Sequence, residues 1–221
     1  MTILEQIHSR THELAHEPSH APTHVSGQQA THRATDRAAH ERRPTAARER
    51  PSRRAMNVGF GASTLGTILV ARSDRGIAAV LIGDDRATLR ADLRRRFPDA
   101  APAEGDAATD ELAATVAFLV DAPACAAELA ALPLDLGGTA FQRTVWQALR
   151  EIPAGSTASY AEIAGRIGRP SSARAVAQAC AANPVAILVP CHRVVGRDGR
   201  LAGYRWGVER KRTLLARETA A

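Results

Sequence analysis

The sequence is organised around Asn183-Pro-Val-Ala-Ile-Leu-Val-Pro-Cys-His-Arg193. Its apolar run, Val185 to Val189, has the length of a buried strand, and Pro190 ends that run because proline lacks an amide hydrogen and fixes its own φ. A thiol, an imidazole and a guanidinium follow directly. Because a nearby histidine and cationic groups lower the pKa of a thiol, the pattern indicates that Cys191 is a nucleophile. The alternative is that Cys191 is a small buried apolar residue, as most free cysteines are.

Short helices with clear ends surround this stretch from Thr139 onward. Capping boxes at 139–142 and 159–162 predict two helix starts, and Gly168 is expected to end the second helix. After a turn that contains proline, Ser172 is expected to cap a third helix that runs to about Ala182. Two short helices joined by a tight turn are typical of a helix-turn-helix.

The third helix has two distinct faces. Residues three and four apart share a face, so one stripe is expected to pack on the core and the other to face outward. These stripes are Val176, Ala179 and Cys180, and Arg174, Gln178 and Ala181. By spacing alone, the outward stripe predicts a helix that lies in the major groove of DNA.

Residues 55–138 read as a small α/β subdomain. The expected elements are strands over 65–71 and 76–82, a helix that Asp84 or Asp85 caps and Pro98 ends, a second helix over 109–121, and a connection over 122–138 with a short strand at 132–136. No catalytic group of residues is visible in this part of the sequence. We therefore expect it to be a scaffold.

Residues 1–54 contain no aromatic residue and few large apolar ones, so we expect a disordered tail. Its histidines fall on every fourth residue from His8 to His24, a spacing that could align metal ligands on a helix. Pro18 and Pro22 would interrupt that helix, and no metal site is predicted.

Composition narrows the class of protein. The chain of 221 residues allows one or two domains, and its three cysteines suit a reduced, cytoplasmic compartment without disulfides. No apolar stretch is long enough for a membrane span. The charge is uneven: residues 1–54 carry +3, residues 55–138 carry −5, and residues 139–221 carry +8. A basic part beside an acidic one predicts that nucleic acid binds the part that bears Cys191.

Several motifs together resemble those of the O6-alkylguanine-DNA alkyltransferases. Pro-Cys-His-Arg and its flanks match the active site of that family, and the likeness extends from about Leu65 to Glu218. The further motifs are Thr139-Ala-Phe-Gln-x-x-Val-Trp, Ser159-Tyr160, Ala173-Arg-Ala-Val176 and Gly203-Tyr-Arg-Trp-Gly207. The last of these is most similar to the carboxy-terminal half of the bacterial adaptive-response alkyltransferase. No cysteine precedes Cys125, so the four-cysteine zinc module of that protein is not carried over.

The resemblance implies a three-part organisation. A tail over 1–54 would precede an α/β subdomain over 55–138, formed by a small ribonuclease H-like sheet with helices. Residues 139–221 would form a mostly α domain with a winged-helix-like helix-turn-helix that binds DNA and accepts the alkyl group.

The resemblance also implies a role for each site residue. Cys191 would take the alkyl group, His192 would act as its base through a water, Glu218 would orient that histidine, and Asn183 would turn the chain and bond within the site. The residues implied for DNA and the flipped base are Tyr160, Arg174, Ser172, Ala173, Gln178, Val194, Tyr204 and Trp206. Here the third helix would enter the minor groove, with Arg174 in the base stack and the Tyr160 phenol on the departing guanine.

The expected activity is direct reversal of DNA damage. A methyl or larger alkyl group would pass irreversibly from O6-alkylguanine, and from O4-alkylthymine, to Cys191, once per molecule and without a cofactor. The expected partner is double-stranded DNA that contains alkylated bases, bound by a monomer with no membrane contact. The alternative is a helix-turn-helix regulator or lesion sensor without chemistry; sensors of this fold lack the thiol. A cysteine hydrolase would not account for the basic helix.

Overall fold

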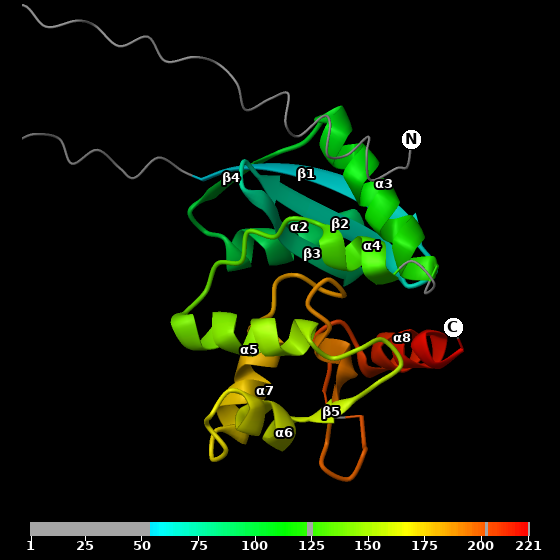
Figure 1. Ribbon diagram of the computed structural model, residues 1–221. Coiled ribbons are helices and arrows are strands. Elements are labelled where there is room, and N and C mark those ends of the chain that lie inside the picture. The colour runs from blue at the N-terminus through cyan, green and yellow to red at the C-terminus, as the bar shows by residue number, and fades with distance from the viewer. Residues whose placement is uncertain (1–53, 123–125, 202, 221) are drawn as a thin grey trace, which may run out of the picture. The chain divides into compact units, whose positions relative to one another are not determined.

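Figure 1 shows the computed structural model of the protein, which describes residues 54–122, 126–201 and 203–220. All of them belong to one unit of the chain, Ser52–Ala221. The predicted histidine-rich tail lies outside the described residues, apart from Arg54, and so does Cys125.

A four-stranded sheet forms the first half of this unit, in the order β3-β2-β1-β4. Its strands are β1 (Arg54–Ser63), β2 (Gly66–Ser73), β3 (Gly76–Gly83) and β4 (Ala100–Ala103). β1, β2 and β3 pair antiparallel, whereas β4 is parallel to β1. The two predicted strands correspond to β2 and β3, which form a hairpin. β1 and β4 were not predicted, because β1 is interrupted by glycines and β4 is a short Ala-Ala-Pro-Ala segment.

Three helices accompany the sheet: α2 (Arg86–Arg96), α3 (Ala107–Asp121) and α4 (Ala126–Ala131). The Asp85 carboxylate accepts a hydrogen bond from the Thr88 amide (2.8 Å) and caps α2, as predicted. The second predicted helix corresponds to α3. Within the predicted connection, α4 was missed, and the expected short strand is reduced to one bridge between Ile77 and Leu134.

Two glycines of β1 allow α3 to lie close against the sheet (Figure 1). A Cβ atom at Gly59 or Gly61 would collide with the backbone of Thr109 or Ala113 on α3. Phe60, between these glycines, faces the other side of the sheet because side chains alternate along a strand. There its ring lies 4.9 Å from the guanidinium of Arg90 on α2. The helices α2 and α3 therefore cover opposite faces.

Helices dominate the second half of the unit (Figure 1). They are α5 (Ala140–Arg150), α6 (Tyr160–Arg166), α7 (Ala173–Ala182), the 3-10 turn η2 (Cys191–Arg193) and α8 (Val208–Thr219). Two short strands, β5 (Ala158–Ser159) and β6 (Val194–Val195), pair in parallel. Both predicted capping boxes are present, at the starts of α5 and α6. Gly168 has φ +71° just after α6, as its expected role requires.

The faces of the third predicted helix, α7, are confirmed. Its inner stripe is buried and its outer stripe, which includes Arg174 and Gln178, is exposed. Ser172 occupies the N-cap position, but its side chain makes no capping hydrogen bond. The predicted start of α7 is therefore correct, but Ser172 does not cap the helix through its side chain as expected.

The predicted strand over Val185–Val189 is wrong. Only Val185 forms a bridge, with Val80 at the edge of β3, and the next residues turn away from the sheet. Ile187 has φ +70°, a conformation that a strand cannot contain. The run is apolar because four of its five residues are buried within a turn, and burial alone cannot distinguish a strand from a packed loop.

Among the described residues, the helices are too short or too polar to cross a lipid bilayer.

Candidate active site

The Asn183 side chain organises the turn that presents Cys191. Its amide oxygen accepts a hydrogen bond from the Val185 amide (2.9 Å). Its amide nitrogen donates to the Val189 carbonyl (2.8 Å) and to the Cys191 sulfur (3.2 Å). Asn183 is fully buried and Cys191 is 5% exposed, so these bonds form away from bulk water. The predicted position of Asn183 within the site is therefore what the structure shows.

The pKa of the Cys191 thiol differs from the sequence-based expectation. Burial raises it to about 11, against the opposing effects of the Asn183 hydrogen bond and the Lys211 charge. The expectation of a lowered pKa is wrong because desolvation of the thiolate outweighs the nearby cations. The thiol of the free protein is therefore protonated at neutral pH and needs a base in order to react.

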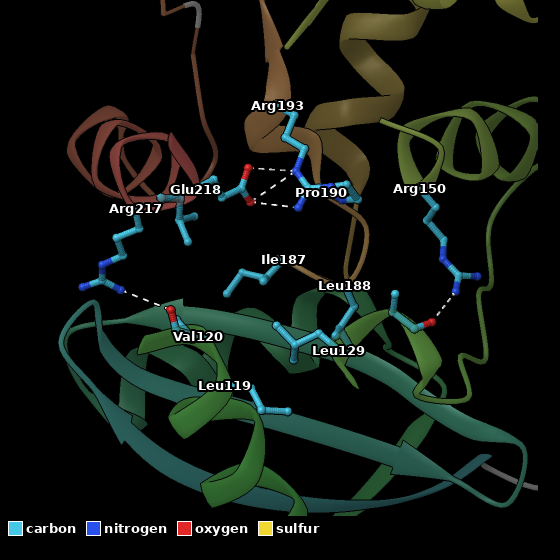
Figure 2. Close-up of a pocket in the computed structure, with 12 residues that line it drawn as sticks. Leu119, Val120, Leu129, Arg150, Ile187, Leu188, Pro190, Arg193, Arg217 and Glu218 are labelled. Atoms are coloured by element: carbon cyan, nitrogen blue, oxygen red, sulfur yellow. Dashed lines mark hydrogen bonds and ion pairs between the residues drawn. The ribbon is translucent and has the colours of Figure 1, made fainter. Parts of the chain in front are cut away.

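His192, which follows Cys191 in the chain, is hydrogen-bonded to the Glu218 carboxylate. His192 Nε2 lies 2.8 Å from Glu218 Oε1, and the imidazole is fully buried. Arg193 donates to both oxygens of the same carboxylate, through Nε to Oε2 (3.0 Å) and through Nη2 to Oε1 (2.9 Å). Figure 2 shows this carboxylate facing the Arg193 guanidinium. The predicted association of Glu218 with His192 is present in the structure.

Proton positions follow from the surroundings of this pair. Burial raises the pKa of Glu218, but hydrogen bonds from His192 and Arg193 outweigh this effect and lower the pKa to about 2. The carboxylate is thus an acceptor only, and His192 Nε2 must carry the proton. Burial also lowers the pKa of His192, although Glu218 opposes this effect, so the imidazole is neutral. His192 Nδ1 then carries a lone pair that can accept a proton. This atom has no hydrogen-bond partner among the described residues.

Lys211 and Arg193 belong to the site but were not among the predicted site residues. Lys211 is fully buried and donates from Nζ to the Val194 carbonyl (2.5 Å). Its charge lowers the pKa of Cys191. Lys211 is the only lysine among 29 basic residues and lies two helical turns before Glu218, a spacing that places both on one face of α8. The spacing between Lys211 and Glu218 could therefore have identified Lys211 as a site residue from the sequence alone.

Aromatic side chains form a wall beside His192. The Tyr204 ring packs edge-on against Trp206, with centroids 5.2 Å apart, and its centroid lies 6.5 Å from that of His192. Both aromatic residues are buried, and neither Tyr204 Oη nor Trp206 Nε1 has a hydrogen-bond partner among the described residues. Val194 is buried in β6, directly after the η2 turn that contains Cys191. The structure thus places the three predicted pocket residues around the Cys191 segment.

The predicted DNA-contacting residues lie on α6 and α7. Tyr160 is the first residue of α6, and burial raises the pKa of its phenol to about 12, so it remains a hydrogen-bond donor. Arg174 and Gln178 are exposed on α7, with Ser172 and Ala173 half-buried at its start. None of these five residues hydrogen-bonds to the Cys191 turn within the described chain. Arg174 and Gln178 face outward beside the site, whereas Tyr160 is half-buried and lies close enough to Cys191 for the two groups to interact electrostatically.

Known proteins resemble this chain in sequence and in structure. The model of the family "6-O-methylguanine DNA methyltransferase, DNA binding domain" matches residues 140–220. The Escherichia coli bifunctional transcriptional activator/DNA repair enzyme Ada is 53% identical over 157 residues, which are 70% of this chain and 43% of that protein. A methylated-DNA–protein-cysteine methyltransferase of Mycolicibacterium paratuberculosis is 59% identical over 87 residues, 39% of this chain and 53% of that protein.

A solved structure extends the likeness to the α/β half. Mycobacterium tuberculosis OGT in complex with DNA is 36% identical, with a TM-score of 0.57, and the match covers 74% of this chain and 93% of that one. The chain spans about half the length of the curated relatives it matches. The match to OGT covers far more of this chain than residues 139–221 contain, so it includes part of the α/β half. This chain belongs to the methylated-DNA–protein-cysteine methyltransferase family, the O6-alkylguanine-DNA alkyltransferases.

Proposed function

We propose that this protein repairs DNA by direct reversal of alkylation. It transfers a methyl or larger alkyl group irreversibly from O6-alkylguanine, and from O4-alkylthymine, to the sulfur of Cys191. The substrate is double-stranded DNA that contains an alkylated base, and no cofactor takes part. The protein acts as a monomer in the cytoplasm.

One observation carries this proposal: His192 Nε2 is held by Glu218, and His192 Nδ1, one residue from Cys191, is buried without a hydrogen-bond partner among the described residues. The resting thiol needs a base to become a nucleophile, and Glu218 fixes the tautomer that leaves Nδ1 available. Because no direct hydrogen bond joins Cys191 to His192, the proton passes through one water molecule. The nearby Lys211 charge stabilises the thiolate as it forms.

The transfer is a displacement at the alkyl carbon. A sulfur–carbon bond forms at Cys191 while the bond between that carbon and O6 of guanine breaks. The thiol proton goes to His192, and the electron pair of the broken bond stays on the guanine, which accepts a hydrogen bond from the Tyr160 phenol. The product is a thioether without an ionisable proton, so the same sulfur cannot react again.

The base must leave the duplex before this reaction, because its exocyclic oxygen is out of reach within the stack. Arg174, exposed on α7, fills the position that the flipped nucleotide vacates. Ser172, Ala173 and Gln178 lie along the same helix and contact the minor groove. Val194, Tyr204 and Trp206 line the pocket that receives the base.

The finer architecture is part of the same proposal. The order β3-β2-β1-β4, with β4 parallel to β1, supports a ribonuclease H-like subdomain over 55–138. The pair α6 and α7, followed by β6, supports a winged-helix-like domain over 139–221.

Incubation with an oligonucleotide that carries one O6-methylguanine tests the proposal. Mass analysis of the peptide that contains Cys191 should show one added methyl group, and the DNA should regain guanine. Tight binding to the lesion without any transfer would favour the alternative of a lesion sensor.

Trp206→Gly should increase the rate of benzyl transfer by tenfold or more, while methyl transfer changes little. The buried indole occupies space that a larger alkyl group needs. Competition between benzylated and methylated oligonucleotides measures both rates. If the intact protein already transfers benzyl as fast as methyl, Trp206 does not border the alkyl pocket.

Arg174→Ala should weaken lesion repair much more than it weakens binding to undamaged DNA. An inserted side chain offsets an unstacking cost of a few kcal/mol, whereas phosphate contacts carry most of the non-specific affinity. Single-turnover rates and binding titrations at one salt concentration compare the two effects. Arg169→Ala, which removes a basic side chain from the turn before α7, is the matched control. Equal losses in both assays would make Arg174 an ordinary phosphate contact.

A further inference from the structure

The pocket loop, residues 203–207, carries Tyr204 and Trp206 into the site. The Gly207 amide donates to the Tyr204 carbonyl (3.0 Å), which closes a turn within the loop itself. That bond shapes the loop itself. The Trp206 carbonyl also accepts from Arg210 Nη1 (2.9 Å), and Arg210 Nε donates to the Leu65 carbonyl (2.7 Å). The position of the aromatic wall must therefore depend on contacts made by side chains.

Arg205 makes one of these contacts, with the α/β half of the molecule. It lies between the two buried aromatic residues and points outward, and its Nη2 donates to Asp92 Oδ1 on α2 (2.8 Å). The Asp92 side chain is only 13% exposed, so this ion pair is partly shielded from water. The contact joins residues 113 positions apart in the chain.

The same carboxylate also reaches toward the Cys191 turn. Asp92 Oδ2 accepts a hydrogen bond from Arg96 Nε (3.1 Å). Arg96 Nη1 in turn makes long hydrogen bonds to the carbonyls of Ala182 (3.5 Å) and Asn183 (3.4 Å). Asn183 is the residue that bonds the Cys191 sulfur. One carboxylate on α2 therefore links the pocket loop to the residue that positions the nucleophile.

We propose that Asp92 is a positioning residue for alkyl transfer, and that it sets the distance between the aromatic wall and the Cys191 turn. The proposal rests on the proposed function and deepens it, because it assigns control of alkyl-group size to the α/β half. The sequence-based expectation gave that half no role beyond a scaffold.

The charges explain why Asp92 is needed. Three guanidiniums, from Arg95, Arg96 and Arg205, surround this single carboxylate at 2.8 to 3.1 Å. Without its negative charge, the poorly exposed Arg96 and the loop residue Arg205 would repel each other. The loop would then move outward from α2, and small displacements of groups that contact a reacting substrate can cost about a hundredfold in rate.

Fluorescence of Trp206 tests the structural part of the proposal without any substrate. The chain contains two tryptophans, and Trp146 lies in the core, so Trp146→Phe leaves Trp206 as the sole indole. In this background, Asp92→Asn and Arg205→Gln should each increase acrylamide quenching of Trp206 at least twofold. Arg95→Ala is the matched control, because it removes a 70% exposed partner of the same carboxylate but leaves the loop contact intact.

Single-turnover kinetics test the functional part. In the Trp206-only and the natural background, Asp92→Asn should lower the maximal rate of methyl transfer about tenfold and raise the ratio of benzyl to methyl transfer. Affinity for undamaged DNA should stay unchanged. Asp92→Glu, which keeps a carboxylate, should restore most of the rate. A residue that only stabilised the fold would lower the fraction of active protein without changing the ratio of the two transfers.

Unchanged quenching and an unchanged ratio in folded Asp92→Asn protein would overturn the inference. If Arg95→Ala behaves like Asp92→Asn, the effect comes from general charge loss and the inference is equally wrong. Failure of the proposed function would look different: the parent protein itself would transfer no alkyl group, while the quenching experiment would still report whether Asp92 holds the loop.

Discussion

Replacement of Cys191 by alanine abolishes alkyl transfer and leaves DNA binding nearly intact: this is the largest effect that we expect. The sulfur is the only atom proposed to form the new bond, whereas the exposed residues of α7 remain in place. The intact protein should clear one lesion per active molecule, however long the incubation, because its thioether product has no proton left to give to His192. Titration against excess methylated oligonucleotide, without added thiol, measures this plateau.

Cys180→Ala is the matched control for that titration. Cys180 is buried on the inner face of α7, and burial raises the pKa of its thiol to about 12. It should therefore neither accept the alkyl group nor extend the plateau. Several lesions repaired per molecule would show turnover, and the single-use mechanism would have to be abandoned.

Glu218→Gln should lower the rate of transfer by about 10² to 10⁴ with little change in DNA affinity. Arg193 donates to both oxygens of the natural carboxylate, so the glutamine oxygen would accept from Arg193 and its NH2 group would face His192 Nε2. Nε2 would then become the acceptor and Nδ1 would carry the proton. His192 would present the wrong tautomer to the thiol, and single-turnover kinetics would record the loss.

The pH dependence of this variant distinguishes lost base catalysis from lost structure. The defect should shrink as the pH approaches 11, where the Cys191 thiol ionises without help. Glu209→Gln, an exposed position on the same helix, should change nothing. A defect of constant size across the pH range would contradict the tautomer argument.

Stability should also depend on Glu218. Its folded pKa of about 2 lies below the ordinary value of 4.5, so its hydrogen bonds stabilise the fold above pH 4.5 and lose that effect as the pH falls toward 2. The Glu218→Gln protein should therefore lose less stability than the natural one over this interval. Urea unfolding at several pH values measures the difference.

The sequence predicted those elements whose signals are local. A capping box indicates where a helix begins, and both predicted boxes, at Thr139 and Ser159, are present in the structure. The i, i+4 pattern of α7 correctly separated Val176 from Arg174. The roles proposed for Cys191, His192 and Glu218 came from family motifs, and the structure brings His192 and Glu218 into contact.

Other features depend on contacts that a linear pattern does not contain. The turn after Val185 exists because the Asn183 side chain bonds three groups within it, and an apolar run gives no sign of such bonds. β4 has little strand propensity of its own and forms because β1 offers it a free edge. Asp92 lies 113 residues from Arg205, so no spacing rule could connect them.

The attachment of the Cys191 turn to β3 has a consequence for how such proteins can be divided. The Val80 amide donates to the Pro184 carbonyl (3.0 Å), and the Ala186 amide donates to the Val80 carbonyl (2.9 Å). The nucleophile's own segment thus covers the edge of the sheet at Val80, where β3 would otherwise present unpaired backbone groups to other chains. A fragment that begins at Thr139 would retain every motif of the family yet lack the strand on which its reactive turn is built. The two halves are therefore not interchangeable modules. A chimera that joins halves from different relatives must preserve the backbone hydrogen bonds between β3 and the Cys191 turn.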